Sequence, residues 1–252
     1  MVQVTNFWLR YSVYRVVSAA FQLFDVGRVH PVRARSLREL ERTVDYIENN
    51  MPDAIGFNTQ REVLDYALSQ TTVAGGYLEA GVFRGGTIRY IQKRLRRMGK
   101  GDVIIHGFDS FEGLPEAWAG GSYLGRSTFS TRGTLPRVPR NVILHKGWFS
   151  ETILKWRASV AETLAFLHVD CDIYSSTAEV LEGLYDRMQV GTVIVFDEYF
   201  NYPDWRRHEF RAWREFVELH NLTYEYLAFA RNQVAIRICT IETEVSTRKE
   251  MP

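Results

Sequence analysis

The chain has 252 residues, of which 46% are hydrophobic and 24% are charged, which excludes a chain disordered throughout and allows a sizeable core. Its 31 basic and 30 acidic side chains give a net charge of +1, which argues against a general polyanion-binding protein. Cys171 and Cys239 are far apart and fit no metal-ligand spacing, so neither a zinc motif nor a disulfide framework is predicted. Reduced thiols agree with a cytoplasmic location.

Residues 1–70 are predicted to form a helical extension in front of the main domain. Its apolar, aromatic stretch from Phe7 to Phe24 contains Arg10 and Arg15, so we expect an amphipathic helix rather than a membrane span. The arginines of the first 42 residues could contact nucleic acid or an anionic membrane, but a solvated helix surface is the preferred interpretation. We therefore expect no nucleic-acid partner and no stable membrane insertion, and we expect these helices to make any homo-oligomer contacts.

Residues 71–240 alternate between strand-like and helix-like segments, and residues 241–252 read as a flexible tail. The nearly all-apolar strands predict an α/β fold with a mostly parallel sheet covered on both faces. The last two strands, separated by a turn at 231–233, predict an antiparallel C-terminal hairpin. The seven predicted strands are Tyr77–Ala80, Val103–Phe108, Val142–His145, Leu164–Val169, Val193–Phe196, Tyr224–Phe229 and Val234–Ile238.

Four acidic residues lie at or just beyond the ends of successive predicted strands: Glu79, Asp109, Asp170 and Asp197. A carboxylate that follows an apolar strand is costly to bury unless it faces a cleft or a partner. In parallel sheets, ligands bind at the carboxyl ends of the strands. The presence of four carboxylates at the carboxyl ends of four strands therefore predicts a binding cleft along that end of the sheet.

A glycine-rich turn, residues 79–86, joins the first predicted strand of this domain to its first helix. Its glycines allow a ligand to approach the backbone, and the helix N-terminus offers free N–H groups, although a structural turn would look the same. The turn lacks the first glycine of the dinucleotide fingerprint and the Gly-Lys-Ser/Thr of a P-loop. Asp109 follows 30 positions after Glu79, where a carboxylate can accept hydrogen bonds from both hydroxyls of a ribose.

Five motifs together resemble the macrocin O-methyltransferase family, over roughly residues 55–238. These motifs are Tyr77 to Gly86, His106 to Pro115, Lys146 to Phe149, His168 to Thr177 and Gly191 to Tyr199. The resemblance implies a Rossmann-like class I methyltransferase that uses S-adenosylmethionine to methylate sugars on macrolides and related natural products. By that resemblance, Glu79, Gly81 and Gly85 would line the methionine end of the cofactor, and Asp109 would hold the ribose. The remaining cofactor contacts would come from Ser110, Phe111, Trp148, Phe149 and Asp170.

The carboxylates of Asp170, Asp172, Asp197 and Glu198 are expected to converge. Such crowding requires a cation or a shared proton, and oxygen ligands suit Mg²⁺, which can activate a bound hydroxyl group. In the resembling family Asp170, Asp197 and the next residue would bind the metal, and Asp172 would be the general base. Here Glu198 replaces the usual second aspartate of an Asp-Asp pair, so Asp197 and Glu198 could instead form a structural or substrate-binding pair.

These patterns predict O-methyl transfer to a small hydroxylated acceptor, such as a sugar or a glycosylated natural product, assisted by Mg²⁺. Three alternatives remain: a metal-independent or catechol-type methyltransferase, a nucleotide-dependent oxidoreductase, and a non-catalytic binding domain. The incomplete dinucleotide fingerprint argues against the oxidoreductase. The acidic residues at all four strand ends argue against a domain without catalysis.

Overall fold

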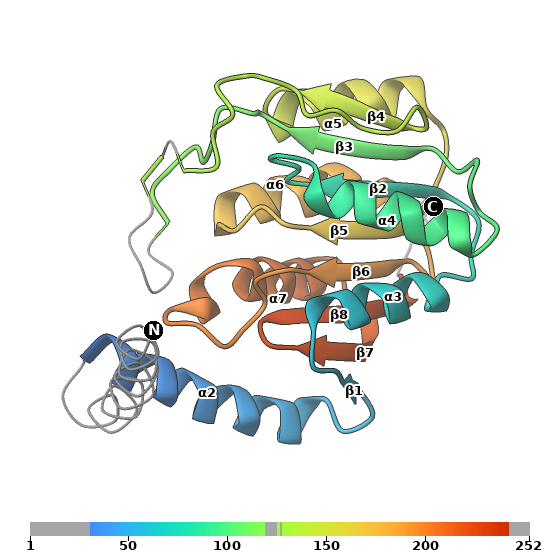
Figure 1. The fold of residues 1–252 in the computed structure, drawn as a ribbon. Helices are drawn as coiled ribbons and strands as arrows, with labels where there is room; N and C mark the ends of the chain where they lie inside the picture. Colours follow the sequence, from blue (N-terminus) through green and yellow to red (C-terminus); the bar gives the residue numbers. More distant parts are fainter. Residues whose placement is uncertain (1–30, 119–124, 127, 242–252) are drawn as a thin grey trace, which may run out of the picture.

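The computed structural model describes residues 31–118, 125–126 and 128–241, and a single mixed sheet runs through them (Figure 1). Its strands are β1 (Ile55–Gly56), β2 (Gly76–Ala80), β3 (Ile105–Asp109), β4 (Val142–Lys146), β5 (Leu164–Val169), β6 (Val193–Phe196), β7 (Thr223–Ala230) and β8 (Gln233–Thr240). Its helices are α2 (Pro31–Asn50), α3 (Gln60–Gln70), α4 (Gly86–Arg97), α5 (Phe149–Ser159), α6 (Tyr174–Leu184) and α7 (Glu209–Leu219), with 3₁₀ turns at Tyr185–Arg187 and Trp205–Arg207.

The strand order is β1-β7-β8-β6-β5-β2-β3-β4. Strands β2 to β6 pair in parallel, whereas β8 is antiparallel to both β6 and β7, which confirms the predicted sheet and hairpin. The chain extends outward from β2 to β4 and then returns to place β5 on the other side of β2. The strand order therefore reverses between β2 and β5, which is where parallel sheets of this type open a ligand crevice.

The sheet has eight strands rather than the seven predicted. The additional strand, β1, has two residues and pairs in parallel with Ala228 and Phe229 of β7. A strand of two residues is too short to show the alternating pattern from which strands are recognised in a sequence. Helix α3 packs against β6, β7 and β8. Strand β1 and helix α3 therefore belong to the sheet domain, although both lie within residues 1–70, the predicted helical extension.

Helices α3 and α4 cover one face of the sheet, and α5, α6 and α7 cover the other (Figure 1). Helix α4 shows why: Ile88, Ile91 and Leu95 recur at helical spacing and are buried, while most of its other side chains are charged or polar. Strand β5 is buried on both faces, so its sequence is apolar except at His168. This one polar residue, His168, lies beside Glu79 and Asp197 at the carboxyl ends of the strands.

Helix α2 lies beside the β1–β7 side of the sheet and packs against the segment that follows β6 (Figure 1). Tyr46 makes edge-on ring contacts with Trp205 and Phe210, and Glu39 accepts a hydrogen bond from Trp205 Nε1 at 3.1 Å. No helix within the described ranges is long and apolar enough to cross a bilayer. The amphipathic helix predicted over Phe7–Phe24 and the predicted tail 242–252 lie outside the described residues.

Candidate active site

A cavity of about 570 Å³ opens at the carboxyl ends of the parallel strands, where the sequence predicted it. Each of β2 to β6 contributes the residues that directly follow it, and α6 and the loop after β3 complete the wall. The lining residues are Gly81, Phe83, Asp109, Ser110, Gly113–Glu116, Phe129, Gly147–Ser150, Asp170–Asp172, Ser175, Ser176, Glu179, Asp197 and Glu198. The cavity therefore has a strongly acidic wall.

Gly81 allows the two central strands to approach each other at the floor of this cavity. Its φ is +92°, and a Cβ atom placed on it would lie 1.6 Å from the carbonyl oxygen of Asp170. The strands are held at this separation by the hydrogen bond from Asp170 N to Ala80 O, 2.8 Å long. Only glycine satisfies both the conformation and the contact, so this residue of the turn has a structural function that ligand binding alone does not explain.

Asp109 ties the glycine turn to the end of β3. Its Oδ2 accepts the backbone N–H groups of Val82 and Phe83 at 2.8 and 2.7 Å, and its Oδ1 accepts the N–H of Phe111 at 2.6 Å. Both oxygens are thus engaged in the turn geometry, while the residue also lines the cavity. The predicted ribose contact would use the remaining lone pairs of a carboxylate that is already fixed in orientation.

The predicted cofactor residues divide into two groups. Gly81, Asp109, Ser110, Trp148, Phe149 and Asp170 line the cavity. The other three predicted residues, Glu79, Gly85 and Phe111, are not among its lining residues. Phe111 is fully buried in the core, and Gly85 caps the N-terminus of α4 with φ +71°. Direct contact between a cofactor and any of these three residues stays a prediction.

Trp148 is the most accessible aromatic residue of the wall, with 39% of its surface exposed. It directly follows Gly147, whose N–H donates to Asp109 O, and it caps the N-terminus of α5 in extended conformation. An exposed indole at a cavity mouth is costly unless a ligand covers it. Its position therefore fits the predicted contact with an adenine ring.

The acidic cluster forms as predicted, with one rearrangement. Oxygens of Asp170, Asp172 and Glu198 lie within 4.8 Å of one another, a set that contains Asp172 in place of the predicted ligand Asp197. Burial and the charge of Asp197 raise the pKa values of Asp170 and Glu198 well above their usual ranges. Glu198 Oε2 is buried without a hydrogen-bond partner among the described residues. Three oxygen donors with one unpartnered atom match the ligands that Mg²⁺ prefers.

Asp172 has the properties of a proton acceptor. Its backbone adopts a left-handed conformation with φ +63°, which is uncommon outside glycine, and the residue lines the cavity. Burial, followed by the charges of Asp197 and Asp109, raises its pKa to about 7. A general base functions best when its pKa is near the working pH, so the predicted base has both a suitable location and a suitable acidity.

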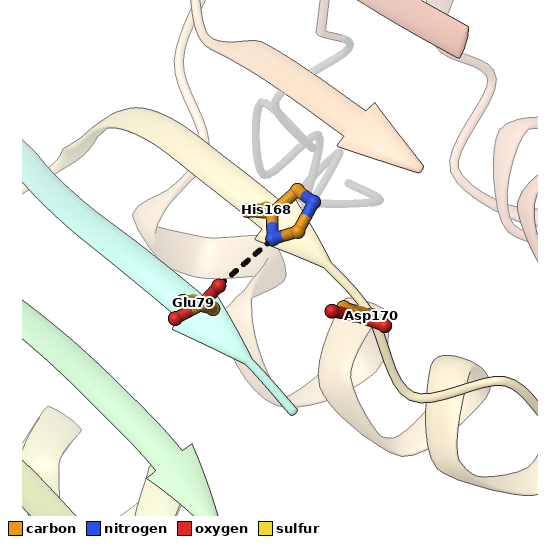
Figure 2. Close-up of side chains that lie close together, drawn as sticks. All are labelled: Glu79, His168 and Asp170. Atoms are coloured by element: carbon orange, nitrogen blue, oxygen red, sulfur yellow. Dashed lines mark hydrogen bonds and ion pairs between the residues drawn. The ribbon is translucent and has the colours of Figure 1, made fainter. Parts of the chain in front are cut away.

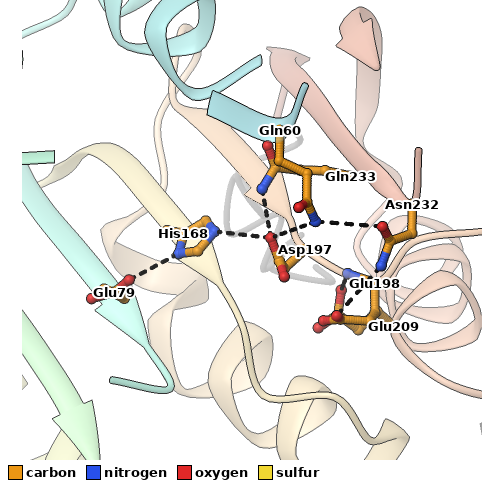
Figure 3. A network of polar contacts seen from close by, with 8 residues as sticks. All are labelled: Gln60, Glu79, His168, Asp197, Glu198, Glu209, Asn232 and Gln233. Carbon is orange, nitrogen blue, oxygen red and sulfur yellow. Dashed lines mark hydrogen bonds and ion pairs between the residues drawn. The ribbon is translucent and has the colours of Figure 1, made fainter. Parts of the chain in front are cut away.

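Asp197 is held by side chains rather than left free. Gln233 Nε2 donates to its Oδ1 at 2.6 Å, and His168 Nε2 lies 3.8 Å from the same oxygen (Figure 3). On the other side of the ring, His168 Nδ1 lies 3.1 Å from Glu79 Oε1 (Figure 2). Burial lowers the pKa of His168, but its interactions with Asp197 and Glu79 outweigh burial and raise that pKa well above its usual range. This raised pKa favours the protonated ring, whose positive charge would offset the surrounding carboxylates.

Several residues of the site were not found from the sequence. His168 was not among the predicted site residues, and its only sign in the sequence is its place two residues before Asp170 in an apolar strand. Glu209 is wholly buried at the start of α7, where its Oε2 accepts the N–H of Glu198 at 3.0 Å. Gln60 and Gln233 approach from α3 and β8, and no sequence pattern marked either of them.

The sequence matches the model of the family described as Macrocin-O-methyltransferase (TylF) over residues 57–235. Demethyldecarbamoylnovobiocin O-methyltransferase from Streptomyces niveus is 27% identical over 215 residues, which cover 79% of this chain and 73% of the relative. An 8-demethyl-8-(2,3-dimethoxy-alpha-L-rhamnosyl)-tetracenomycin-C 4'-O-methyltransferase from Streptomyces olivaceus is 29% identical over 146 residues, which cover 50% of this chain and 54% of the relative.

Two solved structures share the fold. The O-methyltransferase NovP aligns with a TM-score of 0.53 and 25% identity, covering 71% of this chain and 78% of its own. CalS11, a calicheamicin methyltransferase, aligns with a TM-score of 0.55 and 21% identity, covering 82% of this chain and 93% of its own. Because the family model spans most of the sheet and every strand end of the cavity, this chain belongs to the macrocin O-methyltransferase family and is an S-adenosylmethionine-dependent O-methyltransferase with a Rossmann-like class I fold.

Proposed function

We propose that this chain methylates a sugar hydroxyl of a glycosylated natural product, with Mg²⁺ bound beside the acceptor. The observation that carries the proposal is the arrangement of Asp172, Asp170 and Glu198 around one wall of the cavity that Asp109 and the glycine turn also line. Support for a sugar acceptor comes from the names of two relatives, the rhamnosyl-tetracenomycin 4'-O-methyltransferase and mycinamicin III 3''-O-methyltransferase, which is 29% identical over 145 residues.

In the proposed reaction the acceptor hydroxyl loses its proton to Asp172 while its oxygen attacks the methyl carbon of S-adenosylmethionine. The new O–CH₃ bond forms as the S–CH₃ bond breaks, so the products are the methyl ether and S-adenosylhomocysteine. The carboxylate of Asp172 accepts the proton, because its pKa of about 7 leaves it partly ionised at neutral pH. The apolar surfaces of Leu114, Phe129 and Phe149 line the same cavity and exclude water from it.

The donor set fits a divalent cation. Asp170 and Glu198 supply only oxygen atoms, and the unpartnered Glu198 Oε2 would gain a cation as its partner, while Asp172, whose oxygen lies within 4.8 Å of theirs, would stay free to act as the base. When bound, Mg²⁺ supplies a positive charge that lowers the pKa of a coordinated sugar hydroxyl. Asp197 remains a proposed ligand through Oδ2, since Oδ1 is the oxygen that Gln233 contacts.

The test is a transfer assay with methyl-labelled S-adenosylmethionine, Mg²⁺ and a panel of glycosylated acceptors that includes demethyldecarbamoylnovobiocin. Mass spectrometry should find the label on a sugar oxygen with the wild type and not with the Asp172→Asn variant. Transfer to a catechol in the same panel, with none to any sugar, would favour the catechol-type alternative and overturn the proposed acceptor class.

A further inference from the structure

Three side chains from distant parts of the chain approach the same oxygen of Asp197 (Figure 3). They are Gln233 at the start of β8, His168 in β5 and Gln60 at the start of α3, and all three approach Oδ1. We infer that Gln233 and His168 are positioning residues that hold Oδ1, so that Oδ2 is the oxygen of Asp197 presented to the acceptor side of the cavity. The inference rests on the proposed function in one respect, namely that the acceptor and its metal bind at this wall.

The register of the sheet places Gln233 beside Asp197. Strands β6 and β8 are antiparallel, with Phe196 opposite Val234, so the next residue of β6 is Asp197 and its counterpart in β8 is Gln233. Gln233 Nε2 and Asp197 Oδ1 are 2.6 Å apart, and only 1% of Gln233 is exposed. An ionised carboxylate only accepts hydrogen bonds, so the amide nitrogen must face it.

The other end of this amide shows that packing alone does not explain its presence. Gln233 Oε1 is buried and has no hydrogen-bond partner among the described residues. An unpartnered buried carbonyl costs on the order of 1–3 kcal/mol, which an apolar side chain at the same position would avoid. The residue type is therefore explained by the contact that its other end makes with Asp197.

His168 approaches Asp197 from the opposite direction and is itself held by Glu79. Its Nδ1 lies 3.1 Å from Glu79 Oε1 and its Nε2 lies 3.8 Å from Asp197 Oδ1, with none of the ring exposed (Figures 2 and 3). Glu79 is 1% exposed and does not line the cavity. In this geometry Glu79 fixes the plane of the imidazole, and Nε2 faces Asp197 Oδ1 at ion-pair distance with no hydrogen bond among the described residues.

Gln60 is a weaker third contact. Its Nε2 lies 3.5 Å from Asp197 Oδ1 and 3.4 Å from Asn232 Oδ1, so one amide links α3 to the β7–β8 turn and to the site (Figure 3). Two amides donate to Oδ1 and the His168 ring faces the same oxygen at ion-pair distance, so Oδ2 is the oxygen of Asp197 that these three residues leave available. Asp170 and Asp172 have no comparable clamp among the interactions of the described residues.

The first experiment observes the clamp without any acceptor. Proton NMR of ¹⁵N-histidine-labelled protein with bound S-adenosylhomocysteine should show slowly exchanging ring N–H signals from His168, assigned by their loss in His168→Phe. In Gln233→Met, which keeps the side-chain length and removes the donor, the Nε2–H signal should shift or broaden. The matched control is Gln189→Met, because the Gln189 amide nitrogen also donates hydrogen bonds, to Ala74 O and Leu164 O, but at the opposite end of the sheet.

The second experiment measures Mn²⁺ affinity by electron paramagnetic resonance in the same complexes. Gln233→Met should weaken Mn²⁺ binding about 10-fold or more, because partners that orient a metal ligand have effects of this size. Gln60→Met should also weaken Mn²⁺ binding, but by a smaller factor, and Gln189→Met should leave the Mn²⁺ affinity unchanged. In an Asp197→Asn background the effect of Gln233→Met should largely disappear, since the two residues act through one contact.

The outcomes separate the inference from the proposed function. A wild type that binds no Mn²⁺ would remove the metal from the proposed function, and the NMR result would still decide whether the clamp exists. An unchanged His168 Nε2–H signal in a folded Gln233→Met protein would overturn the inference. Additive losses of Mn²⁺ affinity in the Gln233→Met, Asp197→Asn double variant would also overturn it, because they would show independent action.

Discussion

Asp109 and Phe83 are joined by a hydrogen bond in which Phe83 N donates to Asp109 Oδ2 at 2.7 Å, although Phe83 follows β2 and Asp109 is the last residue of β3. The same carboxylate accepts the N–H groups of Val82 and Phe111. One side chain therefore sets the geometry of both turns at this part of the cavity wall. Its removal would leave three backbone N–H groups without their acceptor.

Asp109→Ala should weaken binding of S-adenosylhomocysteine by about 2–4 kcal/mol, because charge-assisted hydrogen bonds to the turn and to the ribose are lost together. Isothermal titration calorimetry measures this directly. Asp186→Ala is the matched control, since Asp186 forms a surface ion pair with Arg157 far from the cavity lining. Equal affinities for Asp109→Ala and the wild type would show that the turn forms without the carboxylate.

Gly81→Ala should destabilise the fold by about 3 kcal/mol or more, because the new Cβ would lie 1.6 Å from Asp170 O and the residue has φ +92°. Gly86→Ala, in the same turn, should instead be neutral or stabilise by up to about 1 kcal/mol, since nothing lies within 4 Å and alanine favours the helix. Urea unfolding of both variants gives the comparison. Similar midpoints for the two would contradict the close approach of β2 and β5.

Asp172→Asn should lower kcat on the order of 10²–10⁴-fold while leaving the affinity for S-adenosylhomocysteine within about twofold of the wild type. Asparagine is the suitable replacement because it tolerates the left-handed backbone that Asp172 adopts, whereas alanine would add strain. Single-turnover rates separate the chemical step from product release. Retention of wild-type kcat would require a different proton acceptor.

Removal of divalent metal with EDTA should abolish methyl transfer, and added Mg²⁺ should restore it. The reason is the crowding of Asp170, Asp172 and Glu198, whose oxygens lie within 4.8 Å and repel one another without a cation. Binding of S-adenosylhomocysteine in EDTA serves as the control for intact protein. Full activity in EDTA would assign charge compensation to His168 and shared protons instead.

The histidine pair His106 and His145 should make stability fall in mild acid. His106 Nδ1 lies 2.9 Å from His145 Nε2, and burial, with the neighbouring His145, lowers the pKa of His106 from 6.5 to about 4. Because the pKa of His106 is lower in the folded protein, the unfolded chain binds a proton at His106 more readily. The contribution of neutral His106 to the free energy of unfolding is therefore complete above pH 6.5 and is lost as the pH falls towards 4. The free energy of unfolding should drop by about 1–3 kcal/mol over that window.

Urea unfolding at pH 7.5, 6, 5 and 4.5 measures the effect, with His106→Gln as the comparison. The variant lacks the titrating ring, so its stability should decrease less steeply with acid than that of the wild type. Parallel stability curves for the two proteins would show that the pair does not control the acid response.

The sheet could be predicted because its strands are buried on both faces and therefore read as apolar runs with carboxylates at their ends. Asp109, Asp170 and Asp197 were found for this reason, since each directly follows such a run, whereas Asp172 was named through the family resemblance. The strand β1 was missed because two residues carry no periodic signal. The grouping of Asp172 with Asp170 and Glu198 depends on a left-handed backbone at Asp172, which the sequence does not show.

The residues that hold Asp197 could not be predicted from local patterns. Gln60 and Gln233 are separated from Asp197 by 137 and 36 positions, and only the order and register of the strands bring them together. In the sequence His168 is a single polar residue in a buried strand, and only the folded structure shows that Glu79 and Asp197 lie on either side of its ring. Contacts of this kind are set by tertiary structure, whereas the strand-end carboxylates are set by the local sequence.

The order of the strands also separates the two walls of the cavity along the gene. The chain completes β2, β3 and β4 before it crosses to β5, so the turns around Asp109 and the acidic wall are encoded on either side of residues 160–163, which join α5 to β5. Recombination between related sequences at this junction would exchange the acidic wall and keep the glycine turn. Such a hybrid must retain a matched Glu79 and His168, because their contact crosses the junction.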